Sequence, residues 1–97
     1  MFKIQTTAQF RSDFQHQLAR EPDIAAFKSV VRHLEQQRPL PPRHCDGQLV
    51  GAPGRWCCLI GFDWWLIYQC DTTAGTITLE QTGPHGYLFE PLTHPDP

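Results

Sequence analysis

The stretch Trp64-Trp65-Leu66-Ile67-Tyr68-Gln69-Cys70 decides the fold, because it is almost wholly apolar. Such a run is typical of a central strand that is covered on both faces of a sheet. Successive side chains of a strand alternate, so Trp64 and Trp65 must point to opposite sides. We therefore expect one tryptophan to face packed helices and the other to face the open side of the sheet.

The segment before this strand predicts two helices, each with one apolar face. The first begins near Thr6, which forms a capping-box pattern with Gln9. The second begins at Asp23, a residue type favoured at helix N-caps. The apolar positions are Phe10, Phe14 and Leu18 in the first helix and Ile24, Phe27, Val31 and Leu34 in the second.

Further strands are predicted over residues 3–6, 55–60 and 76–81, with connecting turns at residues 61–63 and 71–75. The order is therefore one strand, two helices and then a run of antiparallel strands. This order indicates an α+β fold. We expect two antiparallel N-terminal helices packed on a small twisted, mainly antiparallel sheet of four to five strands.

Length and composition fit a single globular domain. The chain has 97 residues, of which 40% are hydrophobic and 11% aromatic, and these fractions argue against disorder. We expect one domain over residues 1–90 and a loose proline-containing tail over residues 91–97. The start of the chain lacks a signal-peptide core and no apolar run is long enough for a membrane span, so we expect a cytoplasmic protein.

Charge and cysteine usage narrow the function classes. Eight Lys and Arg against ten Asp and Glu give a net charge of −2, so the charge of the whole chain does not favour binding to nucleic acid. The cysteine spacings match no CxxC pair and no zinc framework. We therefore expect four reduced thiols and neither a metal nor another cofactor; the cysteines are Cys45, Cys57, Cys58 and Cys70.

Four short sequence motifs follow one another along nearly the whole chain. They are Pro39-Leu40-Pro41; Asp46 with Leu49 and Gly51; Asp63-Trp64 running into Leu66-Ile67-Tyr68; and Thr82-Gly83 followed by His85 and Leu88-Phe89. Together they resemble the RelE/ParE superfamily of bacterial toxins, and its YafQ-like branch most closely. The resemblance implies a RelE-like fold and a type II toxin with a cognate antitoxin, encoded by an adjacent gene.

The resemblance also implies an activity. YafQ-like members resemble metal-independent endoribonucleases that cut messenger RNA in the ribosomal A site, so the implied partners include the ribosome and mRNA. No membrane is implied, and DNA is implied only through the antitoxin complex. In this reaction the 2′-hydroxyl attacks the adjacent phosphate and leaves a cyclic phosphate and a free 5′-hydroxyl. The chemistry needs a general base, a general acid and donors around the phosphorane.

Seven positions carry the site that the resemblance implies. His85 is implied as general acid or base, Asp63 as its partner and Phe89 as a base-stacking platform. Substrate contacts are expected from Arg55, Trp64, His44 and Asp46. Each has a structural alternative: an Asx turn for Asp63, core packing for Trp64, a C-terminal anchor for Phe89, and solvated turn, loop or strand-end positions for the others.

The chain departs from the family pattern at three positions. Gly47 and Leu59 stand where histidines are usual, and Arg55 lies one position before the usual arginine. A second hypothesis is therefore a catalytically degenerate relative that binds an antitoxin or blocks translation without efficient cleavage. A third is a ParE-like gyrase inhibitor, which the retained Asp63 and His85 argue against.

Overall fold

The computed structural model describes residues 1–20, 22–49 and 51–89. Its elements, in chain order, are β1 (Lys3–Thr6), α1 (Ala8–Leu18), α2 (Ile24–Glu35), a 3-10 turn η1 (Pro42–His44), β2 (Gly47–Gln48), β3 (Arg55–Gly61), β4 (Trp64–Asp71), β5 (Thr76–Gly83) and α3 (His85–Leu88). The predicted α+β class is confirmed, and the residues of the expected tail, 91–97, lie outside the described part.

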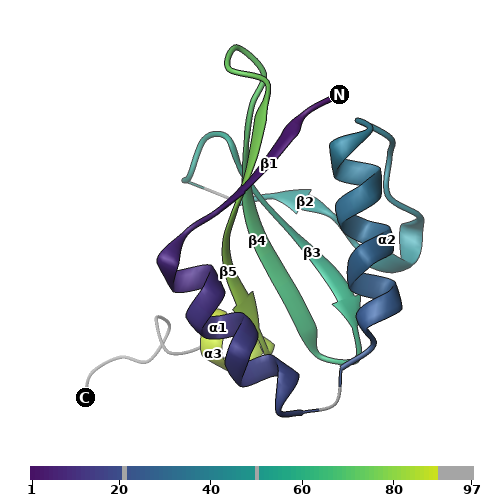
Figure 1. Cartoon of the computed structure of the whole chain (residues 1–97), viewed down its shortest axis with the longest axis vertical. Coiled ribbons are helices and arrows are strands. Elements are labelled where there is room, and N and C mark those ends of the chain that lie inside the picture. The colour runs from purple at the N-terminus through teal and green to yellow at the C-terminus, as the bar shows by residue number, and fades with distance from the viewer. Residues whose placement is uncertain (21, 50, 90–97) are drawn as a thin grey trace.

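The sheet has five strands in the order β1-β5-β4-β3-β2, with the predicted central strand β4 in the middle (Figure 1). β1 pairs with β5 in parallel, and the other neighbours are antiparallel. The expected sheet of four to five strands, mainly antiparallel, is therefore confirmed. β5 continues to Gly83, two residues past its predicted end, so it reaches the start of α3.

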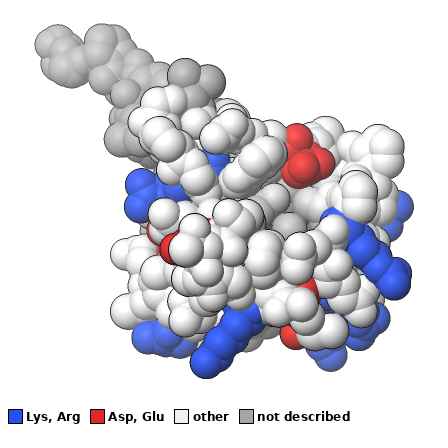
Figure 2. All heavy atoms as spheres, turned by 90° about the horizontal axis from the view of Figure 1, so that it is seen from above, with Lys and Arg blue, Asp and Glu red and all other residues white. Residues whose placement is uncertain are grey.

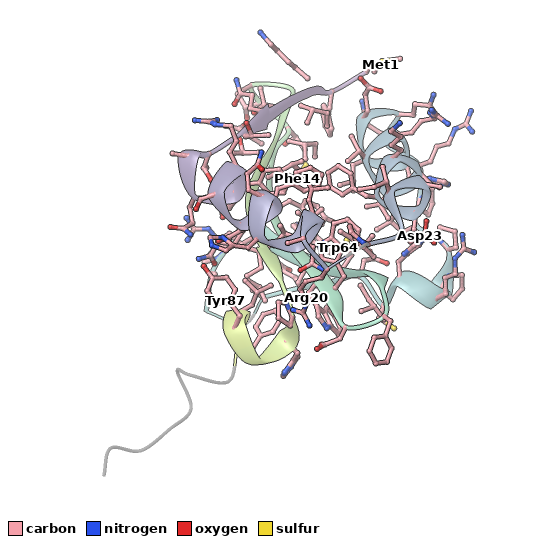
Figure 3. All side chains as sticks on the ribbon, turned by 60° about the horizontal axis from the view of Figure 1, so that its bottom comes forward. Met1, Phe14, Arg20, Asp23, Trp64 and Tyr87 are labelled. Carbon is pink, nitrogen blue, oxygen red and sulfur yellow. The ribbon has the colours of Figure 1, made fainter. Side chains whose placement is uncertain are left out.

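Both long helices cover the same face of the sheet and run in opposite directions along it (Figure 1). Aromatic rings fill the space between helices and sheet: Phe27 stacks on Trp64 with ring centroids 5.6 Å apart, and Phe14 lies 5.0 Å from Phe27. Figure 3 shows Phe14 and Trp64 in this layer. The remaining core lies on the same side and comprises Phe10, Val30, Leu34, Leu40, Cys58, Ile60, Leu66, Tyr68, Ile77 and Leu79.

The predicted start of the second helix is confirmed, whereas the predicted cap of the first helix is wrong by one residue. Asp23 is the N-cap of α2, as predicted, and its Oδ1 accepts the backbone N–H of Ala26 at 3.0 Å. The cap of α1 is Thr7, not Thr6: the Thr7 hydroxyl accepts the N–H of Phe10 at 3.0 Å. Thr6 is still paired with β5 as the last residue of β1, so its backbone cannot start the helix.

The predicted apolar face of the first helix is shorter than expected. Leu18, its third predicted member, is 38% exposed in the last turn of α1.

In the described part of the chain, no helix combines the length and the apolar character that a membrane span requires.

Candidate active site

The two adjacent tryptophans divide between the faces of the sheet, as predicted. Trp64 is 2% exposed on the helix side, where its Nε1 donates a 2.7 Å hydrogen bond to the hydroxyl of Thr82. The Trp64 ring is therefore packed in the core, which is the structural alternative expected for this residue. Trp65 points to the opposite, open face.

On the open face, Trp65 forms an aromatic cluster with His85 and Phe89 of the α3 turn. The Trp65 ring centroid lies 5.9 Å from that of His85 and 6.0 Å from that of Phe89, both in edge-on geometry. The His85 and Phe89 centroids are 4.9 Å apart. Residues four apart share one side of a helical turn, which explains why both rings reach the same tryptophan. His85 is exposed and Phe89 is half-buried.

Asp63 belongs to the same site through the backbone of His85. Asp63 lies in the tight β3–β4 turn with φ of 46°, a left-handed conformation that Asp tolerates better than most residues. Its Oδ1 accepts the backbone N–H of His85 at 3.0 Å. The N-cap residue of α3, Pro84, forms no side-chain capping bond, so Asp63 caps this turn from another element.

A groove of about 560 Å³ continues the open face from Phe89 toward β3. Arg55 lines the groove from β3, and Glu80 lines it from β5, which lies on the other side of β4. The Arg55 Nε donates to Glu80 Oε1 at 2.7 Å, and Nη2 donates to Oε2 at 3.4 Å. This hydrogen-bonded pair raises the pKa of Arg55 and balances its charge, so a phosphate must compete with Glu80 for the guanidinium.

The structure places the last two expected site residues away from the cluster. His44 is 2% exposed, and its Nδ1–H donates to the carbonyl of Leu59 at 2.6 Å. Its Nε2 is buried and has no hydrogen-bond partner among the described residues. Asp46 lines a cavity of about 370 Å³ on the helix side of the sheet, with Trp56 and Tyr68.

The structure therefore brings together His85, Asp63 and Phe89, with Arg55 along the adjoining groove.

The two positions that lack the family's histidines belong to the open face. Gly47 pairs with Cys57, and Leu59 pairs with Trp65. Side chains of directly paired residues point to the same side of a sheet. A histidine at either position would therefore project toward the face that holds the aromatic cluster, and a Cβ at Gly47 would meet nothing within 4 Å.

The described residues offer neither a concentrated basic patch on the face in Figure 2 nor a cluster of possible metal ligands. Figure 2 shows Lys and Arg dispersed toward the edge of one face, without one continuous basic patch. In the portion that the structure describes, no three His, Cys, Asp or Glu side chains are grouped so that they could hold a metal ion.

Two residues of the site were not among those expected from the sequence. The sequence did contain an indication for Trp65, because neighbouring side chains of a strand alternate and either Trp64 or Trp65 had to face the open side of the sheet. Glu80 had none, since it is 25 positions from Arg55 and their pairing follows from strand register.

Comparisons with known proteins agree with this architecture. The sequence model of the bacterial toxin of type II toxin–antitoxin systems, YafQ, matches residues 2–90. A search of curated proteins gives no match.

Solved structures give the same indication. A metal-bound toxin from Helicobacter pylori is 29% identical, with a TM-score of 0.85, and the match covers 92% of this chain and 100% of that one. YafQ in the Escherichia coli DinJ–YafQ complex is 27% identical, with a TM-score of 0.82 and coverage of 92% and 99%. YafQ from E. coli strain BL21(DE3) is 26% identical, with a TM-score of 0.80 and the same coverage. The chain therefore belongs to the YafQ family of toxins of bacterial type II toxin–antitoxin systems.

Proposed function

We propose that this toxin is a metal-independent endoribonuclease that cleaves messenger RNA on the ribosome by 2′-hydroxyl attack. The observation that carries the proposal is the position of His85, which is exposed, lies edge-on to Trp65 and is held through its backbone by Asp63. An imidazole can take the hydroxyl proton or supply a proton to the leaving oxygen.

The surrounding residues have complementary roles in this proposal. The rings of Trp65 and Phe89 offer apolar surfaces on which a nucleobase can stack. Arg55 can contact a phosphate through its planar guanidinium once Glu80 releases it. Asp63 acts by holding the first residue of α3, because one of its carboxylate oxygens already accepts the N–H of His85.

We also propose that the toxin binds a cognate antitoxin. Support comes from the E. coli relative, which was solved in complex with DinJ. Protein segments commonly bind a partner by adding a strand to an exposed sheet edge or by laying a helix into a groove. The product of the adjacent gene should co-purify with this chain and slow its amide hydrogen exchange. Unchanged exchange would contradict this part of the proposal.

The nuclease proposal is tested by cleavage of messenger RNA on programmed ribosomes. We expect His85→Ala to lower the cleavage rate by roughly 10²- to 10⁴-fold, the usual contribution of general acid–base catalysis. His33→Ala is the control, since His33 lies on α2 and its Nδ1 donates to the carbonyl of Ser29 within that helix. Equal cleavage by wild type and His85→Ala would remove His85 from the mechanism.

A second function is favoured by three residues on the open face. Gly47 and Leu59 stand where histidines are usual in the family, and the carboxylate of Glu80 forms an ion pair with the guanidinium of Arg55. The alternative is a catalytically weak toxin that binds its antitoxin or blocks translation. If folded wild type and His85→Ala both fail to cleave but arrest translation equally, this alternative replaces the first proposal.

A further inference from the structure

α3 is too short to hold its own position. It spans His85–Leu88, and its N-cap residue Pro84 supplies no side-chain hydrogen bond. Isolated helices of this length do not persist in water, because helix nucleation is unfavourable. Contacts with the rest of the chain must therefore fix the turn that carries His85 and leads into Phe89.

One such contact comes from Asp13 of α1, which is 4% exposed. Its Oδ1 accepts hydrogen bonds from the Tyr87 hydroxyl at 2.7 Å and from Gln9 Nε2 at 2.8 Å, and its Oδ2 accepts the backbone N–H of Thr82 at 3.2 Å. A buried carboxylate requires such donors, because an unpaired buried charge is costly. Tyr87 supplies one of them and thereby joins α3 to α1.

The Tyr87 ring has a second fixed contact, with Gly83 at the end of β5. A Cβ added at Gly83, where φ is +155°, would lie 2.9 Å from Tyr87 Cδ2, which is closer than carbon atoms approach without displacement. The hydrogen bond to Asp13 raises the pKa of Tyr87, so the phenol remains a donor across neutral pH. Figure 3 shows Tyr87 on α3, beside α1.

Tyr87 lies on the side of the α3 turn opposite to the candidate active site. Residues i and i+4 share one side of a helical turn, and residue i+2 points away from them. His85 and Phe89 contact Trp65, whereas Tyr87 contacts Asp13. A rotation of this turn would therefore move the Tyr87 hydroxyl from Asp13 and both rings from Trp65 together.

We infer that the Asp13–Tyr87 hydrogen bond positions His85 and Phe89, so that Asp13 and Tyr87 are positioning residues for the active site. The catalytic consequence rests on the proposed nuclease function, whereas the structural consequence does not.

The test compares Tyr87→Phe with Tyr68→Phe. Both changes remove one phenolic hydroxyl, but Tyr68 is buried in the core on the other side of the sheet. NMR spectra of protein with ¹³C-labelled histidine rings report the surroundings of His85, because the Trp65 ring, 5.9 Å away between centroids, should shift the His85 signals through its ring current. In Tyr87→Phe we expect the His85 signal to move several-fold more than that of His33, which lies on α2; His16 is not a reference, because it lines a cavity with Tyr87. In Tyr68→Phe the His85 signal should stay in place.

Cleavage adds a second readout. We expect Tyr87→Phe to lower the maximal rate by between about tenfold and hundredfold with little change in KM, because a small misplacement of reacting groups has effects of this size. An unchanged His85 signal in folded Tyr87→Phe would overturn the inference, and so would equal movement of all the histidine signals. The NMR result stands even if the wild type does not cleave RNA, so the two proposals can fail separately.

Discussion

The carboxylate of Asp63 accepts the backbone N–H of His85 at 3.0 Å and so joins the β3–β4 turn to the first residue of α3. The two residues are 22 positions apart, and both were expected in the site from the sequence. Their relationship is through the backbone of His85, with the Asp63 carboxylate acting as a cap. This makes Asp63 a residue that holds His85 in place, a role that neutral Asn can also fill.

Two substitutions at Asp63 separate its charge from its hydrogen bond. Asp63→Asn keeps an acceptor oxygen and tolerates the left-handed backbone, so we expect stability and cleavage close to wild type. Asp63→Gly keeps only the backbone freedom and loses the hydrogen bond to His85, which should destabilise the fold by up to about 1 kcal/mol, the usual net contribution of one hydrogen bond, and lower cleavage. Urea unfolding and ribosome-dependent cleavage measure both effects. A large loss of cleavage in fully stable Asp63→Asn would instead show that the negative charge takes part in the chemistry.

Glu80 should limit the affinity of the toxin for RNA. Glu80→Gln removes the charge that balances Arg55, and we expect RNA to bind about three- to tenfold more tightly at low salt, the effect of one unit charge a few ångströms away in water. The log–log salt dependence should steepen by about 0.7, as for one additional phosphate contact on a single strand.

Gln81→Glu is a useful opposite control for Glu80→Gln, because Gln81 lines the same groove and the change adds a negative charge there. Equal affinities for wild type and Glu80→Gln at all salt concentrations would show that Arg55 does not contact phosphate.

Alkaline pH should destabilise the fold through two buried acids on the helix side of the sheet. Burial, with smaller contributions from nearby Cys57 and Asp46, raises the pKa of Cys58 to about 12, and burial also raises the pKa of Tyr68. The unfolded chain therefore releases these protons at lower pH than the folded chain does. The stabilising contribution is complete below about pH 9 and falls as pH rises toward 12.

Urea unfolding between pH 8 and 11 measures this effect. Each proton retained only by the folded state should lower the free energy of unfolding by up to about 1.4 kcal/mol per pH unit. Cys58→Ala and Tyr68→Phe should each make the alkaline decline shallower, whereas Cys45→Ala, at an exposed position, should not. A flat stability profile for wild type up to pH 11 would contradict the prediction.

Much of the fold could be predicted because its signals are local. The apolar run of β4 identified the central strand, and the alternation of Trp64 and Trp65 identified its two faces. The Asp23 cap has its partner three residues away. The Thr6 cap failed because β1 keeps Thr6 in register with Leu79, and that pairing depends on a strand more than seventy positions away.

The site was less predictable, because its geometry depends on register and on contacts between distant segments. His44 and Asp46 are close in sequence, but one lies buried against β3 and the other lines a cavity on the helix side. Asp13 and Tyr87 are 74 positions apart, and neither carries a local pattern that indicates a pair. The resemblance located His85, Asp63 and Phe89, whereas the structure was needed to add Trp65 and Glu80.

Restoring the missing histidines should increase the activity. Gly47 and Leu59 pair with residues of the open face, Cys57 and Trp65, and a side chain at Gly47 meets no atom within 4 Å of its Cβ. We expect the double variant Gly47→His/Leu59→His to cleave messenger RNA at least about tenfold faster than wild type, because each added proton donor or acceptor can supply roughly 10²- to 10⁴-fold when it is well placed.

The matched control for this gain is Gly47→Gln/Leu59→Gln, which adds polar side chains that do not titrate. It should remain at the wild-type rate. Adding His85→Ala to the histidine variant should remove the gain, since a general acid and a general base are both needed for the transfer. If the folded histidine variant cleaves no faster than its glutamine control, the absence of histidines at positions 47 and 59 does not limit cleavage by this chain, and the prediction is wrong.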